Sequence, residues 1–281
     1  MGALHDAANG GDIAKLKSLL DSGEDINNLD DTEGAAIHYA CDKGHYDIVK
    51  ELIKCGADLE IYSDEWDVPL TIAVAEGYTR ISKLLIENFN DIDSEYGQRL
   101  ICFAASSGNL ETLKYVLSVC GPVDIEKCRP FYTPLHWAAQ ENHPEIVKYL
   151  LDLDIDVNSV DEQGRTPLFA SMAKDDCAAM KVLIANGADV NFRTEESKDN
   201  CLQLAAVLNL LDFVNLLLDS GADINILDAK DRTALMPAVD HENIEMIKLL
   251  IERGADMTIK NYKGKTAVDY ARSEKIRELL K

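Results

Sequence analysis

Apolar residues recur along the chain with a period near 33 residues, and within each period they follow helical spacing. The first apolar residue of each period serves as its marker. The markers are Leu4, Ile37, Leu70, Ile101, Leu135, Leu168, Leu202, Leu235 and Val268. An apolar pair, such as Leu150-Leu151, follows fifteen and sixteen residues after each of the first eight markers. Apolar residues three or four positions apart predict an amphipathic helix. Each period therefore predicts two short helices.

Residues suited to turns separate the predicted helices. The residues between the two helices of a period are Gly11, Gly44, Gly77, Gly108, Asn142, Asp175, Asn209 and Glu242. All except Glu242 are types that favour left-handed backbone, so Glu242 is expected to break the series. One period is too small to bury its own apolar face, so neighbouring repeats must stack. The sequence predicts one domain, residues 1–281, whose repeats lie near 1–33, 34–66, 67–97, 98–131, 132–164, 165–198, 199–231, 232–264 and a cap at 265–281.

Two motifs bring this period close to a known family. They are Thr133-Pro134-Leu135-His136-Trp137-Ala138-Ala139 and the repeat ending Gly187-Ala188-Asp189-Val190-Asn191. With the period they resemble ankyrin repeats over the whole chain. The resemblance implies an all-α solenoid of stacked helix-turn-helix repeats with short turn or β-hairpin tips. It also implies a non-catalytic module for protein–protein interaction, an adaptor, scaffold or inhibitor, that binds its partner through a concave surface.

Charge narrows the class of partner. The 281 residues carry 28 Lys and Arg against 50 Asp and Glu, a formal net charge of −22. Such a chain is repelled by nucleic acid and by anionic membranes, so we expect neither as a partner. We expect a monomer that binds another protein through a basic surface or a basic segment of that protein.

The cysteines and the N-terminus bear on the compartment. Seven scattered cysteines fit a reducing environment better than a disulfide framework. The first residues have neither the basic stretch nor the apolar stretch of a signal peptide. We expect a cytoplasmic protein, with the nucleus or delivery into a host cell as alternatives.

Candidate chemistry is sparse. The resemblance implies that His5, His38 and His136, which share one position of the repeat, are structural and bond neighbouring repeats. The sequence has no C-x-x-C pair, phosphate loop, nucleophile elbow or H-E-x-x-H motif. We therefore expect no enzyme activity, catalytic residue, metal or cofactor. Two alternatives stay open: an effector of an intracellular microbe that uses the same surface on a host protein, and a metabolite-binding sensor or enzyme.

Aromatic and arginine side chains gather near the tips of repeats three to five, and we interpret them as a partner-binding patch. The patch comprises Tyr62, Trp66, Tyr96, Arg99, Arg129, Phe131 and Tyr132. Tyrosine, tryptophan and arginine are enriched at binding hot spots. The equal alternative is that these rings pack irregular loops, which is the interpretation we favour for the nearby Phe89.

The resemblance also implies a modification. Ankyrin repeats are often substrates of an asparaginyl hydroxylase that reads L-x5-[D/E]-φ-N, where φ is apolar. The matching asparagines are Asn27, Asn158, Asn191 and Asn225. The same spacing is also the turn signature of the repeat itself, so stability alone explains it.

Truncation of two rings separates binding from loop packing. If Trp66 or Tyr132 is a hot spot, its replacement by Ala weakens partner affinity by about 2 kcal/mol and barely changes the melting temperature. If the rings pack loops, Trp66→Ala and Tyr132→Ala lower the melting temperature and leave affinity unchanged. Titration calorimetry and thermal melting on both variants measure the two quantities.

Overall fold

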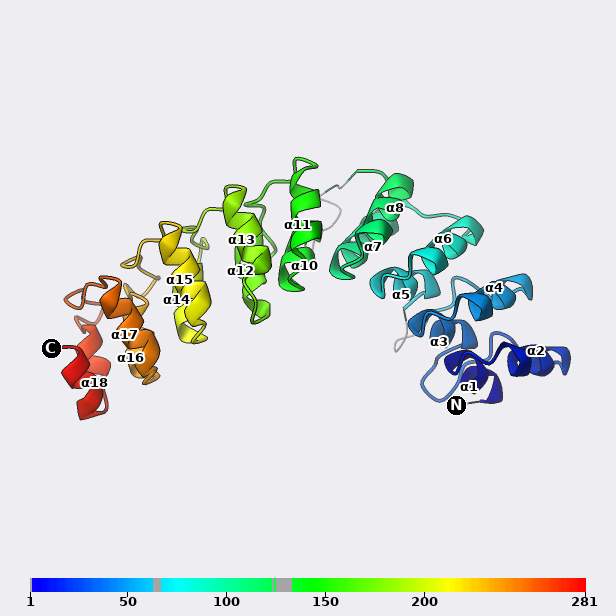
Figure 1. Ribbon diagram of the computed structural model, residues 1–281, viewed down its shortest axis with the longest axis horizontal. Helices are drawn as coiled ribbons and strands as arrows, with labels where there is room; N and C mark the ends of the chain where they lie inside the picture. Colours follow the sequence, from blue (N-terminus) through cyan, green and yellow to red (C-terminus); the bar gives the residue numbers. More distant parts are fainter. Residues whose placement is uncertain (1, 63–66, 123, 125–132) are drawn as a thin grey trace. The chain divides into compact units, whose positions relative to one another are not determined.

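The computed structural model describes residues 2–62, 67–122, 124 and 133–281. The described residues form helices and turns and contain no assigned β-strand, so the predicted all-α fold is confirmed. Contacts group the chain into two compact units, Met1–Cys128 and Arg129–Lys281, each with its own stack of helix pairs (Figure 1). We call them the N-terminal unit and the C-terminal unit. A single domain over residues 1–281 stays a prediction.

The N-terminal unit stacks the helix pairs of repeats one to four. They are α1 (Ala3–Asn9) and α2 (Ile13–Asp21), α3 (Ala36–Asp42) and α4 (Tyr46–Lys54), α5 (Pro69–Ala75) and α6 (Thr79–Asn88), and α7 (Ser94–Ser106) and α8 (Leu110–Cys120). The first helices α1, α3, α5 and α7 contact one another in succession, and the second helices form a parallel row beside them (Figure 1).

The C-terminal unit continues the same plan. Its helices are α10 (Pro134–Gln140) and α11 (Pro144–Leu151), α12 (Pro167–Ala170) with the 3₁₀ turn η1 (Ser171–Ala173) and α13 (Ala178–Ala185), α14 (Cys201–Val207) and α15 (Leu211–Asp219), α16 (Leu235–Asp240) and α17 (Ile244–Glu252), and the 3₁₀ turn η2 (Ala267–Tyr270) with α18 (Glu274–Leu279). The cap at residues 265–281 stays a prediction.

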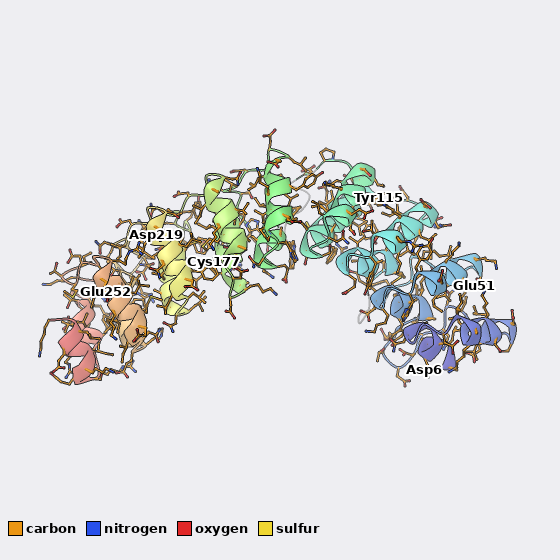
Figure 2. All side chains as sticks on the ribbon, in the orientation of Figure 1. Asp6, Glu51, Tyr115, Cys177, Asp219 and Glu252 are labelled. Carbon is orange, nitrogen blue, oxygen red and sulfur yellow. The ribbon has the colours of Figure 1, made fainter. Side chains whose placement is uncertain are left out.

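The core is the row of marker residues. The first eight markers are at most 2 % exposed, whereas Val268 in the last repeat is 43 % exposed. In repeats two to eight the first member of the apolar pair is buried and the second is half-exposed, whereas Leu19 and Leu20 of repeat one are both half-exposed. Each fully buried Leu or Ile contributes roughly 2 kcal/mol relative to an exposed one. Side chains fill the space between the helices of each unit (Figure 2). The lower burial at both ends follows because an end repeat has only one neighbour.

Two turns between helices differ from the prediction. They are the turn at Glu242 in repeat eight and the turn at Asp175 in repeat six. Glu242 adopts the left-handed conformation, with a φ of 57°, although glutamate does not favour it. Asp175, the expected turn former, does not adopt it, because the first helix of its repeat ends early in η1 and the chain follows another path. Packing therefore imposes the turn geometry more strongly than residue type does.

The glycine between two helices also makes room for the next repeat. Gly44 has a φ of +72°, and a Cβ built on it would lie 2.7 Å from Cζ of Tyr78. Tyr78 is the residue before α6, so its ring covers the turn of the repeat before it. Gly56 has a similar φ of +86°, but a Cβ there meets nothing within 4 Å.

This difference predicts the stability of two alanine variants. In Gly56→Ala the only cost is a side chain on left-handed backbone, and this lowers the free energy of unfolding by about 1 kcal/mol. Gly44→Ala adds the clash with the Tyr78 ring, so it costs at least about 1 kcal/mol more. Urea unfolding of both variants measures this, and equal losses would contradict the ring contact.

Candidate functional site

Buried histidines connect each repeat to the next. Nε2 of His5, His38 and His136 lies 2.9, 3.0 and 2.9 Å from the carbonyl oxygens of Asn28, Ile61 and Arg165. A carbonyl oxygen only accepts, so each ring donates from Nε2 into the connecting segment that follows. The expectation that these histidines are structural is confirmed by this geometry.

Other residues occupy the histidine position in the remaining repeats. In repeat seven Gln203 donates from Nε2 to the carbonyl oxygen of Ile226, 3.1 Å away, and to that of Arg232. In repeat six the position holds Phe169, which cannot bond. The Thr166 hydroxyl, buried at the place where Thr133 bonds Nδ1 of His136, has no hydrogen-bond partner among the described residues.

The four candidate asparagines are also used between repeats. Oδ1 of Asn27, Asn158, Asn191 and Asn225 accepts a hydrogen bond from the backbone N–H of Asp58, Asp189, Asp223 and Asp256, at 2.8–2.9 Å. The aspartate two residues before each asparagine bonds the backbone N–H of that asparagine, as Asp189 does for Asn191 at 2.9 Å. The motif is thus a ladder along the repeats, and hydroxylation of these side chains stays a prediction.

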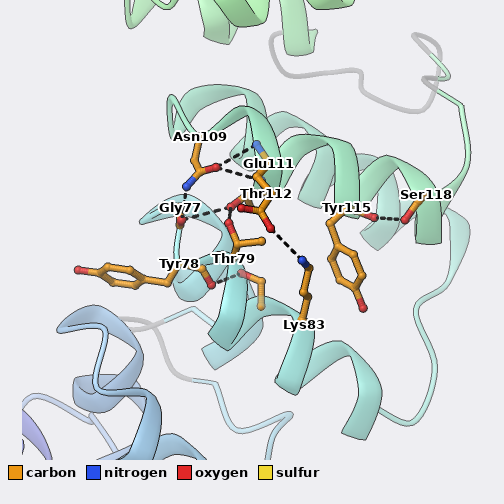
Figure 3. Close-up of polar contacts among 10 residues, drawn as sticks. Gly77, Tyr78, Thr79, Lys83, Asn109, Glu111, Thr112, Tyr115 and Ser118 are labelled. Atoms are coloured by element: carbon orange, nitrogen blue, oxygen red, sulfur yellow. Dashed lines mark hydrogen bonds and ion pairs between the residues drawn. The ribbon is translucent and has the colours of Figure 1, made fainter.

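A third set of bonds joins repeats three and four. Oγ1 of Thr79 lies 2.7 Å from Oγ1 of Thr112, and both residues are buried. Asn109 donates from Nδ2 to the carbonyl oxygen of Gly77 at 2.8 Å (Figure 3). Thr79, Thr112 and Asn109 therefore bond across this interface and support the stacking of the two repeats.

The predicted aromatic patch is described only in part. Tyr62 is 66 % exposed. Arg99 is exposed and lies 3.8 Å from the carboxylate of Asp67. The other members, Trp66, Arg129, Phe131 and Tyr132, lie outside the described residues, as does Cys128.

Tyr96 has a structural role. It lies in the first turn of α7, and its hydroxyl is 3.0 Å from Oγ1 of Thr71, which occupies the histidine position of repeat three. Its ring stacks on Phe89 with centroids 5.8 Å apart. Burial raises the pKa of Tyr96 to about 12. Tyr96 thus replaces the bond that histidine makes elsewhere, and this favours loop packing for Tyr96 and for Phe89.

Leu29 is an exposed apolar residue outside the predicted aromatic patch. It occupies the same position in repeat one as Tyr62 does in repeat two, and it is 42 % exposed. The sequence indicates the exposure of Leu29 by its position. It lies 33 residues before Tyr62, in a segment without Lys or Arg.

Two open grooves border repeat six. One, of about 480 Å³, is lined by Asp175, Asp176, Asp212, Asp219 and other residues, and Lys181 supplies a cation. The other, of about 400 Å³, lies between the tips of repeats five and six and includes Glu162, Glu195 and Glu196. Within the described ranges, no group of three or more His, Cys, Asp or Glu residues is placed to hold a metal ion. None of the helices described is both long and apolar enough to cross a membrane.

The family model for ankyrin repeats matches residues 4–96, 101–194 and 202–281. The chain belongs to the ankyrin repeat family. The matched ranges include the histidine position, the asparagine ladder and the buried markers. Membership of this family agrees with the observed geometry, in which helix-turn-helix repeats stack through one repeated set of contacts. Ankyrin repeats indicate a protein–protein interaction module.

Several curated relatives share parts of this repeat array. The mouse ankyrin repeat and SOCS box protein 14 is 28 % identical over 144 residues, 48 % of this chain and 24 % of the relative. A putative ankyrin repeat protein, R96, of Acanthamoeba polyphaga mimivirus is 37 % identical over 83 residues, 29 % of this chain and 8 % of the relative. Human neurogenic locus notch homolog protein 1 is 33 % identical over 114 residues, 40 % of this chain and 4 % of the relative. The chain thus matches only a small share of each relative.

The buried histidines predict a pH dependence of stability. Burial lowers the pKa of His136 and of His38 below the ordinary value of 6.5. As the pH falls below about 7, these histidines therefore bind protons in the unfolded chain before they do so in the folded chain. The folded ankyrin stack loses stability relative to the unfolded chain between that pH and the lower pKa of the folded state.

Repeat seven supplies the variant that tests this. There Asn200 bonds Gln203 at 2.7 Å, in the positions that Thr133 and His136 occupy in repeat five. The double variant Thr133→Asn/His136→Gln is expected to lose less stability than the wild type between pH 7.5 and 5.5, measured by urea unfolding. His241→Gln, at an exposed position, is the control and should keep the wild-type slope. Parallel slopes for all three proteins would contradict the assignment.

Proposed function

We propose that this chain is a non-catalytic ankyrin module, an adaptor, scaffold or inhibitor, that binds one partner protein through its first helices and connecting segments. The observation that carries the proposal is that the polar side chains at several fixed positions of the repeat serve stacking. Histidine, glutamine, asparagine and threonine in the repeat positions bond the neighbouring repeat. The exposed first-helix and connector positions are free of that constraint, so their residues can be chosen for recognition.

The partner is proposed to be basic. The members of the predicted aromatic patch other than Tyr96 remain part of its proposed contact. The net charge of −22 supports this because a complementary charge speeds association and excludes acidic competitors. The chain is proposed to act as a monomer in the cytoplasm. An effector role inside a host cell would use the same surface and differ only in where the partner resides.

A photo-crosslinking comparison tests which face binds. Benzoylphenylalanine is placed at Asp6 and Leu208, exposed positions at first helices, and at Lys50 and Lys148, exposed positions on second helices. In lysate of the native organism, the first pair is expected to crosslink one common protein and the second pair is not. Crosslinking of that protein mainly at Lys50 and Lys148 would contradict the proposal.

The charge of the partner makes a separate prediction. With the crosslinked partner purified, its association rate constant is expected to fall several-fold between about 15 and 150 mM NaCl, because the Debye length shortens over that range. Stopped-flow mixing measures this rate. A rate that stays flat would show that the partner is not steered by charge, while a metabolite that raises the melting temperature would support the sensor alternative instead.

A further inference from the structure

Charge is distributed unevenly along the repeats. Residues 257–281, which include the connector of repeat eight and the last repeat, carry seven Lys or Arg against three Asp or Glu, a formal charge of +4. The other 256 residues carry 21 Lys or Arg against 47 Asp or Glu, a formal charge of −26. A basic region on an acidic protein attracts anionic groups that the rest of the surface repels.

The lysines of this region concentrate in the connector that follows α17. We define the basic connector as residues 258–265, which contain three lysines and no Asp or Glu. The equivalent segments of repeats five and seven, residues 158–165 and 225–232, each contain two acidic residues. The three lysines are all exposed, and they are Lys260, Lys263 and Lys265.

One residue difference changes the charge of this turn. In repeat seven the buried carboxylate of Asp228 forms an ion pair with Arg232 at 2.7 Å. Repeat eight has Asn261 in the position of the aspartate and Lys265 in the position of the arginine. Because an amide is neutral, Asn261 cannot form the equivalent ion pair with Lys265.

Asn261 nevertheless fixes the shape of the turn. It is buried, and its Oδ1 accepts hydrogen bonds from the backbone N–H groups of Lys263 and Lys265 at 2.9 and 3.0 Å. Its Nδ2 donates to the hydroxyl of Tyr270 at 2.6 Å. The backbone of the basic connector is thus held in place while its lysine side chains are exposed. A preorganised turn of this kind loses less conformational freedom when it binds a ligand.

An exposed aromatic ring lies among the lysines. Tyr262 is 57 % exposed, and Nζ of Lys263 lies 5.3 Å from the centroid of its ring. The backbone N–H of Tyr262 donates to the carbonyl oxygen of Lys230 at 3.2 Å. This bond places the connector of repeat seven, with the exposed Lys230, beside the basic connector. Tyrosine is enriched among the residues that dominate binding energy.

One carboxylate near the basic connector has a structural role. Asp269 accepts a hydrogen bond from the N–H of Thr266 at 2.7 Å, at the start of η2. It is also attracted to Lys260 and Lys265, and with the bonds from Thr266 this lowers its pKa below the ordinary value. An acidic ligand therefore competes with Asp269 for two of the lysines.

We propose that the basic connector, together with Lys230, binds an acidic, extended segment of another protein that carries apolar side chains among its carboxylates. The carboxylates bind the lysines, and an apolar side chain packs on the ring of Tyr262. A short segment responds to the charge within about a Debye length, roughly 8 Å, whereas a nucleic acid or a membrane also meets the repulsion of the other 256 residues. This surface goes beyond the proposed function, which concerns a basic partner.

The test uses a labelled nine-residue peptide, three repeats of Glu-Glu-Leu, in anisotropy titrations with the 281-residue chain. The variant Lys260→Gln/Lys263→Gln/Lys265→Gln is expected to weaken binding at least tenfold. The control replaces three exposed lysines of α2 and α4 and changes the net charge by the same amount, so it should bind within twofold of wild type. This control is Lys15→Gln/Lys17→Gln/Lys50→Gln.

Two further substitutions separate the ring from the charges. Tyr262→Ser is expected to weaken binding several-fold, whereas Tyr62→Ser, which replaces an equally exposed tyrosine of the N-terminal unit, should leave it unchanged. Asp269→Asn keeps an acceptor for Thr266 and removes the competing charge, so it is expected to strengthen binding several-fold. A gain in affinity cannot arise from partial unfolding, which keeps this test independent of stability.

Three results would overturn the proposal. They are failure of the peptide to bind at about 50 mM NaCl, equal losses in the two triple variants, and unchanged binding in Asp269→Asn. Sedimentation of the chain alone checks whether the acidic part of a second copy is the occupant. Self-association that the Lys260, Lys263 and Lys265 variant abolishes would contradict a segment of another protein. Each of these results leaves the proposed basic partner unaffected, because the photo-crosslinking positions lie outside the basic connector.

Discussion

Each repeat of this protein depends on hydrogen bonds that only its neighbour can supply. The histidine, glutamine and asparagine side chains at fixed positions reach from one repeat to backbone groups of the next. The histidine and glutamine side chains are buried in the stack, where an unpaired polar group costs about 1–3 kcal/mol. Stacking satisfies them at the same time as it buries the marker residues, and this couples the polar ladder to the apolar core.

That coupling explains where the chain tolerates irregularity. Repeat three replaces histidine by Thr71, and Tyr96 from the next repeat reaches back to it, so the connection survives with a different donor. Repeat six replaces histidine by Phe169, and Thr166 is left without a partner. The same repeat has the shortened first helix, and two open grooves border it. Loss of one inter-repeat bond and loss of regular helix geometry thus coincide in one place.

The demands of stacking also define which surface is available for recognition. Because the polar repeat positions are occupied by stacking contacts, the residues that can vary without loss of stability are exposed ones, which include positions on first helices and connectors. The two units use this freedom differently. In the C-terminal unit, the connector residues Asp161 and Asp228 form ion pairs with Arg165 and Arg232 of the same turn. In repeats one and two, the connectors carry the exposed apolar side chains of Leu29 and Tyr62. The two units therefore differ in the side chains that their connectors present.

The period of apolar residues was sufficient to predict the repeat, its helices and its core. A period near 33 places chemically equal residues in equal environments, so Leu70 and Leu135 were identified as buried without knowledge of their contacts. The position of Tyr62 in a connector already indicated that its side chain is exposed. The exposed fraction itself depends on the folded structure.

Residues that depart from the period take their roles from contacts that the fold creates. Tyr96 looked like a surface ring and instead bonds Thr71, because α7 begins within its segment and turns the ring toward the preceding repeat. Glu242 adopts left-handed backbone and Asp175 does not, because the packing of both flanking helices sets the dihedral angles of the turn. Local composition reports the preference of one residue. The role of Tyr96 depends on Thr71, 25 residues away, which the stretch of sequence around Tyr96 does not contain.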